Sequence, residues 1–305
     1  MINRILIVGT GLIGASTGLA LRAAGFTGHI TGAGPTEATL TTALQMGAID
    51  HFLPPAELTH AHPPAAREAD LILLAGPVLS ILDWMHRLAP ILQPHQLVTD
   101  VGSTKLQISS LAAKLYNQPG RAHFLPGHPM AGKESGGAAL AEPTLFHNAM
   151  WLFTPIPSNP TRGPTSDPTP EPHPLEFEWR ALVQKFGART MDLAPARHDE
   201  ICAWVSHLPQ MLSTALAALL EDTFAADPAA RDQIAAIGGR ALRETTRLGA
   251  SPYSMWRDIA LTNADPIAHT LHMLEQRLAH LRENLRTPEL KEEFRLANRF
   301  RTPQK

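Results

Sequence analysis

A histidine set between two turn-forming neighbours is the residue of this chain best suited to chemistry. His128 follows Gly127 and precedes Pro129, so its backbone belongs to a tight connection and not to a helix. A neutral imidazole there could accept a proton from a substrate hydroxyl, or could cap a turn as a structural group. The apolar run over residues 122–126 predicts a strand that ends just before it. Strand ends are where open parallel sheets usually carry reactive groups.

A glycine-rich loop near the N-terminus has the spacing of a dinucleotide-binding turn. Gly9, Gly11 and Gly14 follow an apolar run and open a helical pattern that includes Leu12 and Ile13. The first glycine would allow a tight turn, the second would let the backbone approach a pyrophosphate, and the third would allow close helix–strand packing. The amides at the start of the helix would face the phosphates. The loop predicts NAD or NADP as cofactor, an ordinary glycine-rich turn being the alternative.

One element of this signature is missing. An acidic residue about 20 positions further on usually holds the ribose hydroxyls, but that place is occupied by Gly34. Glu37 comes late and is expected to belong to the next helix. Thr36 could donate a hydrogen bond to a 2′-phosphate, and no carboxylate would repel that group. The choice between NAD and NADP therefore stays open.

Strand and helix patterns alternate through the first half of the chain. We expect strands at residues 4–9, 28–33, 70–76, 96–101 and 122–126, and helices at 12–24, around 40–46, at 81–92 and at 106–116. This alternation predicts an α/β fold with a Rossmann-type, doubly wound parallel sheet.

The second half has a different character. Eight prolines between Pro155 and Pro174 predict a linker or loop. Helical patterns follow at 197–220, kinked or restarted at Pro209, and at 228–247, 266–285 and 288–300. The expected division is a dinucleotide-binding domain over 1–157, a linker over 158–175, and an all-helical substrate and dimerisation domain over 176–305.

Composition limits the possible functions. The 305 residues are 44% hydrophobic and 18% charged, with a net charge of −2, which suits a globular protein and offers no electrostatic basis for binding nucleic acid. Cys202 is the only cysteine, so an intrachain disulfide is impossible. We expect a cytoplasmic protein with no membrane span. The other histidines show no ligand spacing, so we also expect no metal.

With these residues in view, the chain resembles the prephenate/arogenate dehydrogenase family of tyrosine biosynthesis. The resemblance runs from the glycine loop to about residue 260, apart from the proline-rich segment, and no appended regulatory domain is expected after the helices. It implies a helical domain that dimerises and closes over the cofactor cleft. The segments that carry it are Asp100–Lys105, Gly127–Gly132, Ser206–Pro209, Thr246–Ser251 and Trp256–Asp258.

The resemblance implies roles in the first half of the chain. His128 matches the catalytic histidine that accepts a hydrogen bond from the substrate hydroxyl. Ser103 matches the serine that orients both that histidine and the substrate hydroxyl. Lys105 could supply positive potential to the substrate, or could be a solvated residue at a helix start. Trp256 is expected at the pocket wall.

Further matches fall in the helical half. Arg247 matches the arginine that grips a substrate carboxylate, a surface ion pair being the alternative. His207 matches a histidine that faces the substrate, and could equally be a core histidine. Gln210 stands where the family has a second histidine; it keeps a donor and an acceptor but cannot carry charge. Ser251 occupies the place where an acidic residue would favour the ammonium group of arogenate, which leans the prediction toward prephenate.

The expected reaction is oxidative decarboxylation of prephenate with hydride transfer to NAD(P)⁺, with arogenate as the alternative substrate. Two other functions stay open. One is a dehydrogenase of the hydroxy-acid type, although those enzymes usually rely on a lysine base in the helical domain. The other is a nucleotide-binding protein without turnover, against which Ser103, His128 and Arg247 argue.

Overall fold

The computed structural model describes residues 1–56, 64–156 and 173–302. These residues form two compact units. Unit 1 comprises Met1–Cys202 and Ala250–Thr262, and unit 2 comprises Ala203–Gly249 and Asn263–Lys305. Most of the expected linker over 158–175 lies outside the described residues.

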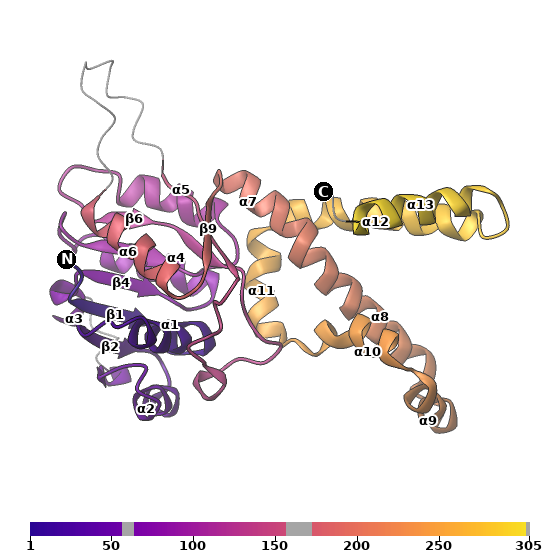
Figure 1. The fold of residues 1–305 in the computed structure, drawn as a ribbon, viewed down its shortest axis with the longest axis horizontal. Helices are drawn as coiled ribbons and strands as arrows, with labels where there is room; N and C mark the ends of the chain where they lie inside the picture. Colours follow the sequence, from indigo (N-terminus) through magenta and orange to yellow (C-terminus); the bar gives the residue numbers. More distant parts are fainter. Residues whose placement is uncertain (57–63, 157–172, 303–305) are drawn as a thin grey trace, which may run out of the picture. The chain divides into compact units, whose positions relative to one another are not determined.

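A six-stranded parallel sheet forms the centre of unit 1 (Figure 1). Its strand order is β3-β2-β1-β4-β5-β6, and every adjacent pair is parallel. The first strand lies inside, with later strands added on both sides, so the expected doubly wound fold is confirmed. The strands are β1 (Arg4–Val8), β2 (His29–Ala33), β3 (His51–Phe52), β4 (Leu71–Leu74), β5 (Leu97–Asp100) and β6 (His123–Leu125).

Helices cover both faces of this sheet because its strands are apolar on both faces. In β1, Ile5 and Ile7 pack into one buried cluster, whereas Leu6 and Val8 pack into another on the opposite face. The covering helices are α1 (Leu12–Ala23), α2 (Glu37–Gln45), α3 (Pro64–Glu68), α4 (Val78–Leu88) and α5 (Leu106–Leu115). Glu37 begins α2, as expected.

A second, three-stranded sheet was not expected from the sequence. It consists of β7 (Gly127–Pro129), β8 (Met150–Phe153) and β9 (Arg189–Asp192), with β7 antiparallel and β9 parallel to β8. Helix α6 (Pro174–Lys185) packs beside β9, and Trp151 and Trp179 join the core of unit 1. Residues 176–202 therefore belong to unit 1, although the sequence analysis expected them in the helical domain. Pairing with β8, which cannot be read locally, holds them there.

Two further helices complete unit 1. They are α7 (Pro195–Cys202) and α11 (Tyr253–Thr262). The backbone N–H of Leu79 at the start of α4 donates to a carboxylate oxygen of Asp258 in α11, at 3.1 Å. The hydroxyls of Thr104 and Thr262 lie 2.7 Å apart. A distant segment thus returns to the sheet unit through one buried and one partly buried polar contact.

Unit 2 is helical. The expected helix over 197–220 is interrupted before Pro209, where the turn Ala203–His207 is π-helical. The expected helix over 228–247 is divided at Gly238 and Gly239. None of the helices in the described residues is long and apolar enough to cross a membrane. The helices are α8 (Leu208–Phe224), α9 (Pro228–Ile237), α10 (Arg240–Thr246), α12 (Ala264–Glu283) and α13 (Glu289–Arg301).

Candidate active site

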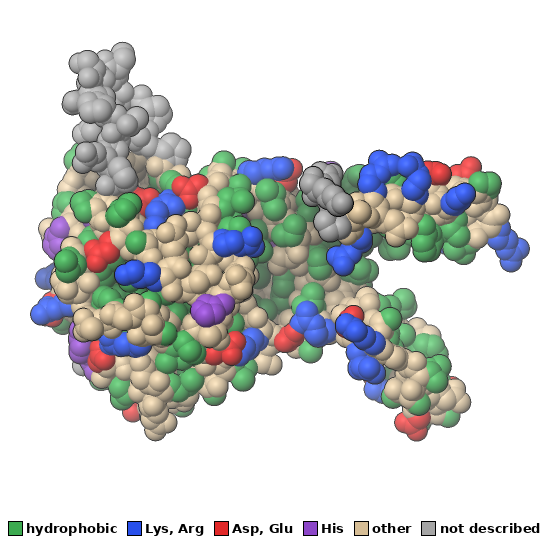
Figure 2. All heavy atoms as spheres, viewed as in Figure 1, with side chains coloured by type: hydrophobic (Ala, Val, Ile, Leu, Met, Phe, Trp, Pro, Cys, Tyr) green, Lys and Arg blue, Asp and Glu red, His purple; other side chains and the backbone are tan. Residues whose placement is uncertain are grey.

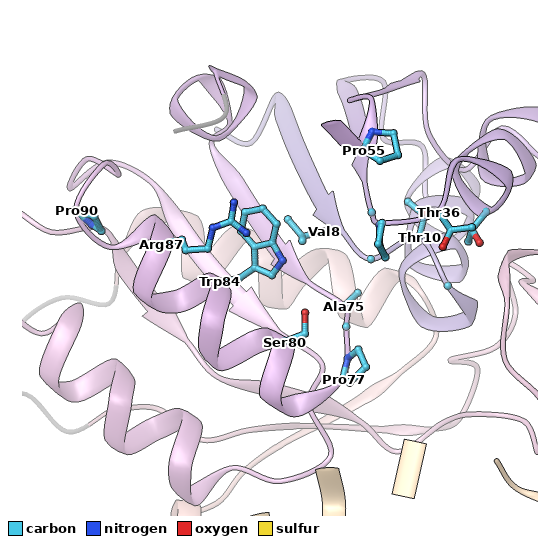
Figure 3. A pocket seen from close by; sticks show the side chains of 16 residues that line it. Val8, Thr10, Thr36, Pro55, Ala75, Pro77, Ser80, Trp84, Arg87 and Pro90 are labelled. Carbon is cyan, nitrogen blue, oxygen red and sulfur yellow. The ribbon is translucent and has the colours of Figure 1, made fainter. Parts of the chain in front are cut away.

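A cavity of about 990 Å³ lies at the carboxyl ends of the parallel strands (Figure 3). Gly9 and Gly11 form one wall, Gly34 and Thr36 follow β2 on another side, and α4 supplies a third. In Figure 3, Ser80, Trp84 and Arg87 lie along α4, across the cavity from Thr10, Thr36 and Pro55. The cavity has the position expected for a dinucleotide in this fold.

The three loop glycines fit a dinucleotide, each for a different reason. Gly9 has a φ of +99°, and a Cβ there would lie 2.7 Å from the carbonyl oxygen of Ala75. A Cβ on Gly14 would overlap the Gly9 carbonyl oxygen. Gly11 faces open space, since a Cβ there would meet no described atom within 4 Å, and its backbone is therefore accessible to a ligand. The loop could thus hold a pyrophosphate against the start of α1.

The lining of this cavity is neutral or basic. Among the described residues that line it, none carries a carboxylate. The hydroxyl of Thr10 is buried without a hydrogen-bond partner in the described part of the chain, beside Gly34. The guanidinium of Arg87 stacks over the Trp84 ring at 4.0 Å. Thr10 and Arg87 were missed in the sequence analysis: Thr10 stands between Gly9 and Gly11, at a position that the glycine spacing does not specify, and Arg87 lies far from the loop in sequence.

His128 and Ser103 line a second cavity, of about 370 Å³. Leu12 and Ile13 line it as well, at the start of α1. The two cavities share residues 75–77, the turn between β4 and α4. A cofactor held in the first cavity could therefore extend into the cavity that contains the histidine.

His128 lies in strand β7, and its neighbour Gly127 is held by a buried ion pair. Lys105 and Asp100 are both fully buried and form this pair. The ammonium of Lys105 donates to the Gly127 carbonyl oxygen at 2.7 Å, and the Gly127 N–H donates to Asp100 at 3.1 Å. A Cβ on Gly127 would lie 2.8 Å from the Asp100 carbonyl oxygen, so the close approach requires glycine.

This arrangement gives Lys105 a different place from the expected one. Its side chain is buried instead of solvated, and it is not among the residues lining the second cavity. Burial lowers the pKa of the Lys105 ammonium, and the adjacent carboxylate of Asp100 opposes that shift. The segment Asp100–Lys105 thus holds the strand of His128 in place and presents Ser103 to the cavity.

Helix α11 and the residue before it close one side of this second cavity within unit 1. Pro252, Ser254 and Met255 line it, whereas the neighbouring Ser251 and Trp256 do not. Asp258 accepts from the N–H of Leu79 at the start of α4, so its role is structural. Glu134 adds a carboxylate to the lining that the sequence analysis did not single out.

The remaining candidates lie in unit 2. Arg247 is exposed and begins the short 3-10 turn Arg247–Ala250. His207 is buried, with its Nδ1 3.1 Å from the amide nitrogen of Asn263. Gln210 is buried as well, and its amide donates to the carbonyl oxygen of Leu248 at 2.7 Å. Gln210 therefore contacts the turn that carries Arg247.

The fold and these cavities define a class. A doubly wound parallel sheet with a glycine loop after its first strand, beside a histidine-bearing cavity, is that of an NAD(P)-dependent dehydrogenase. Two family models match the chain: "Prephenate dehydrogenase, nucleotide-binding domain" over residues 17–162 and "Prephenate dehydrogenase, dimerization domain" over residues 194–301. Since together they cover more than half of it, the chain belongs to the prephenate dehydrogenase family.

Individual relatives agree with this assignment. A prephenate dehydrogenase of Bacillus subtilis is 31% identical over 88% of this chain and 66% of its own length, so the chain spans about two thirds of that relative. The structure of Aquifex aeolicus prephenate dehydrogenase with hydroxyphenyl propionate and NAD⁺ is 26% identical, with a TM-score of 0.81 and coverage of 99% of this chain and 98% of that one. Synechocystis arogenate dehydrogenase is 29% identical, with a TM-score of 0.72 and 98% coverage of both chains.

Proposed function

We propose that the protein oxidises and decarboxylates prephenate to 4-hydroxyphenylpyruvate with NAD(P)⁺. The observation that carries the proposal is the placement of His128 and Ser103 in a cavity that shares residues 75–77 with the dinucleotide cavity. A base close to the hydride acceptor is what oxidation of a ring alcohol requires.

The proposed chemistry conserves atoms and charge. A nicotinamide cofactor held against Gly9 and Gly11 would supply the acceptor for the hydride that leaves C4 of the substrate ring. His128 takes the proton of the C4 hydroxyl, and Ser103 orients that hydroxyl. The bond between C1 and its carboxylate then breaks, carbon dioxide leaves, and the electron pair completes the aromatic ring. The proton returns from His128 to the phenolate oxygen.

We assign binding of the substrate carboxylate to Arg247, and a supporting role in that binding to His207 and Gln210. A guanidinium can hold a carboxylate through two parallel hydrogen bonds. The contact of Gln210 with Leu248 favours a role in fixing the turn of Arg247. Trp256 and Ser251 belong to the segment that forms the wall of the catalytic cavity, without lining it themselves.

Arogenate is the second candidate substrate. It differs from prephenate in carrying an ammonium group where prephenate has a keto group, and Glu134 places one carboxylate in the cavity lining. One of the similar structures is an arogenate dehydrogenase. Ser251 still leans the proposal toward prephenate, because no carboxylate stands at that position.

For the cofactor we propose that both NAD and NADP are used, with a modest preference for NADP. Gly34 and Thr36 leave the ribose end without a carboxylate, and Arg87 places a positive charge in the same cavity. Substituting Gly34→Asp should shift preference toward NAD, since a carboxylate would repel the 2′-phosphate. Strict use of NAD by the unchanged protein would contradict this part of the proposal.

We further propose a cytoplasmic homodimer formed through unit 2. The matched family model of this region is named for dimerisation. Apolar side chains that stay exposed on unit 2 include Leu219, Ile237, Leu278 and Phe294. The single, buried free cysteine suits a reducing compartment.

The proposal is tested by a matrix of steady-state assays with prephenate or arogenate and NAD or NADP. The protein should form reduced nicotinamide and carbon dioxide with at least one pair. His128→Asn should lower kcat by roughly 10²-fold or more, and Arg247→Ala should mainly raise KM. Folded, cofactor-binding protein that turns over neither substrate would contradict the proposed function.

A further inference from the structure

The imidazole of His128 has a second histidine behind it. Nδ1 of His128 lies 2.9 Å from Nε2 of His198, which is in helix α7 of the same unit. The His198 side chain is fully buried. No motif in the sequence drew attention to His198, which stands 70 positions after His128.

A carboxylate follows His198 in the same chain of contacts. Nδ1 of His198 lies 2.8 Å from Oδ1 of Asp199. The same carboxylate accepts from the backbone N–H groups of Lys105, at 2.6 Å, and Leu106, at 2.9 Å, at the start of helix α5. Because two backbone N–H groups donate to its oxygens, the Asp199 carboxylate acts as an acceptor.

This order of contacts determines where the protons lie. Because Asp199 can only accept, Nδ1 of His198 must carry a proton and donate it. In a neutral His198 the other nitrogen, Nε2, is then an acceptor, so Nδ1 of His128 must donate to it. The lone pair of His128 is left on Nε2, the nitrogen available to take a proton from a substrate.

We propose that His198 and Asp199 are positioning residues that fix the tautomer of His128 and stabilise the charge it gains. The inference rests on the proposed function, in which His128 is the base. When His128 takes the substrate proton, its positive ring would be hydrogen-bonded to a histidine that is itself polarised by Asp199. Neither residue contacts the reacting atoms, so both act through His128.

The other groups around His198 are consistent with a neutral ring. Burial lowers its pKa, and the charge of Lys105 acts in the same direction, against the opposing effects of Asp199 and Asp100. The thiol of Cys202 lies 3.6 Å from Nε2 of His198, and burial raises the pKa of that thiol to about 12. The thiol is therefore a weak donor to the same lone pair.

The tautomer of His128 can be measured in a way that does not depend on enzyme turnover. In protein labelled with ¹⁵N-histidine, the His128 signals, identified by their loss in His128→Asn, should show a protonated Nδ1 and an unprotonated Nε2 at neutral pH. The Asp199→Asn variant should lose this pattern. A proton on Nε2 of His128 in the unchanged protein would overturn the inference, whatever the enzyme turns over.

Kinetics provide the second test. Asp199→Asn and His198→Leu should each lower kcat by roughly 10- to 100-fold, part of the contribution of a general base, with little change in KM. In Asp199→Asn the acid limb of the kcat profile should move to lower pH, because the protonated pair of His128 and His198 loses its counter-charge. His198→Gln should recover part of the rate, since an amide oxygen can accept from Nδ1 of His128.

Controls separate this role from folding and from metal binding. His198→Leu leaves the Asp199 contacts at the start of α5 in place. A loss of kcat in this variant at an unchanged thermal midpoint therefore cannot come from a folding defect of the kind that Asp199→Asn could cause. Cys202→Ala changes a neighbour of His198 and should keep kcat.

The donor atoms of His128, His198 and Cys202 lie within 4.8 Å of one another, so the protein is also assayed with Zn²⁺ and with a chelator. Activity lost to the chelator and restored by Zn²⁺ would overturn the inference, as would near-normal kcat in both His198→Leu and Asp199→Asn when His128→Asn is inactive.

Discussion

The two units bury opposite kinds of side chain. Unit 1 encloses apolar clusters on both faces of its parallel sheet, and its buried charges, such as Lys105 and Asp100, are paired. In unit 2 the buried side chains are largely polar, whereas many large apolar side chains are exposed. The buried polar ones include His207, Gln210, Ser213, Asn263 and Thr270.

The contrast indicates that unit 1 completes its own core, whereas unit 2 leaves apolar area for another surface to cover. Figure 2 shows apolar side chains along the helical arms of unit 2. Between α8 and α12 there is a groove of about 540 Å³, lined by Leu212, Leu271 and Leu278 among others. Large exposed apolar patches usually mark an interface with another molecule. Four substitutions or conditions test the contrast.

The largest effect is expected in the interior of unit 1. Lys105→Met leaves the carboxylate of Asp100 buried without its cation, which should cost about 3–5 kcal/mol of unfolding free energy. Urea unfolding followed by circular dichroism measures this. Lys114→Met, at an exposed position of helix α5, which begins directly after Lys105, is the matched control and should stay within about 0.5 kcal/mol. Equal unfolding free energies of the two variants would show that the buried ion pair does not stabilise unit 1.

The next effect separates the surfaces of the two units. Leu278→Glu replaces an exposed apolar side chain of α12, which should be nearly neutral in a monomer but should disrupt a dimer that covers this face. Light scattering should then report half the mass of the unchanged protein. Leu44→Glu, on helix α2 of unit 1, is the control and should leave the mass unchanged. A dimer that persists in Leu278→Glu would place the interface elsewhere.

A smaller effect is expected from the polar interior of unit 2. Gln210→Leu removes the hydrogen bond to the Leu248 carbonyl oxygen and should loosen the turn of Arg247. A lost hydrogen bond of about 1 kcal/mol corresponds to a rise in KM of roughly fivefold, with kcat little changed. Gln210→His, which restores a ring N–H donor, should recover most of the affinity. A fall in kcat at unchanged KM would contradict a purely supporting role.

The smallest effect is the pH dependence of unit 1. Burial lowers the pKa of His173 and His198, and burial together with the charge of His29 lowers that of His51. Their folded pKa values lie below the unfolded value near 6.5, so the stability they contribute is complete above that pH and is lost as the pH falls below it. Thermal midpoints measured from pH 7.5 down to 5.5 should therefore decrease. His173→Gln should make the decrease shallower, and an unchanged slope would contradict the assignment.

Much of unit 1 could be predicted from local sequence. The apolar runs of β1 and β4 and the spacing of Gly9, Gly11 and Gly14 determine a parallel sheet with a dinucleotide turn, because these patterns reflect burial and backbone geometry within a few residues. Short strands such as β7 and β9 were not predicted. Their three or four residues form a sheet only by pairing with β8.

Some residues of the candidate site could likewise be predicted from local sequence, and others could not. The sequence by itself determined that His128, Ser103 and the glycine loop belong to a dehydrogenase, since each lies in a local motif. Only the tertiary structure placed Lys105 in a buried ion pair, brought Arg87 to the dinucleotide cavity, and set His198 behind His128. The physical reason is that proton positions, buried charges and cavity walls depend on contacts between residues far apart in the chain. Such contacts leave no periodic or local pattern in the sequence.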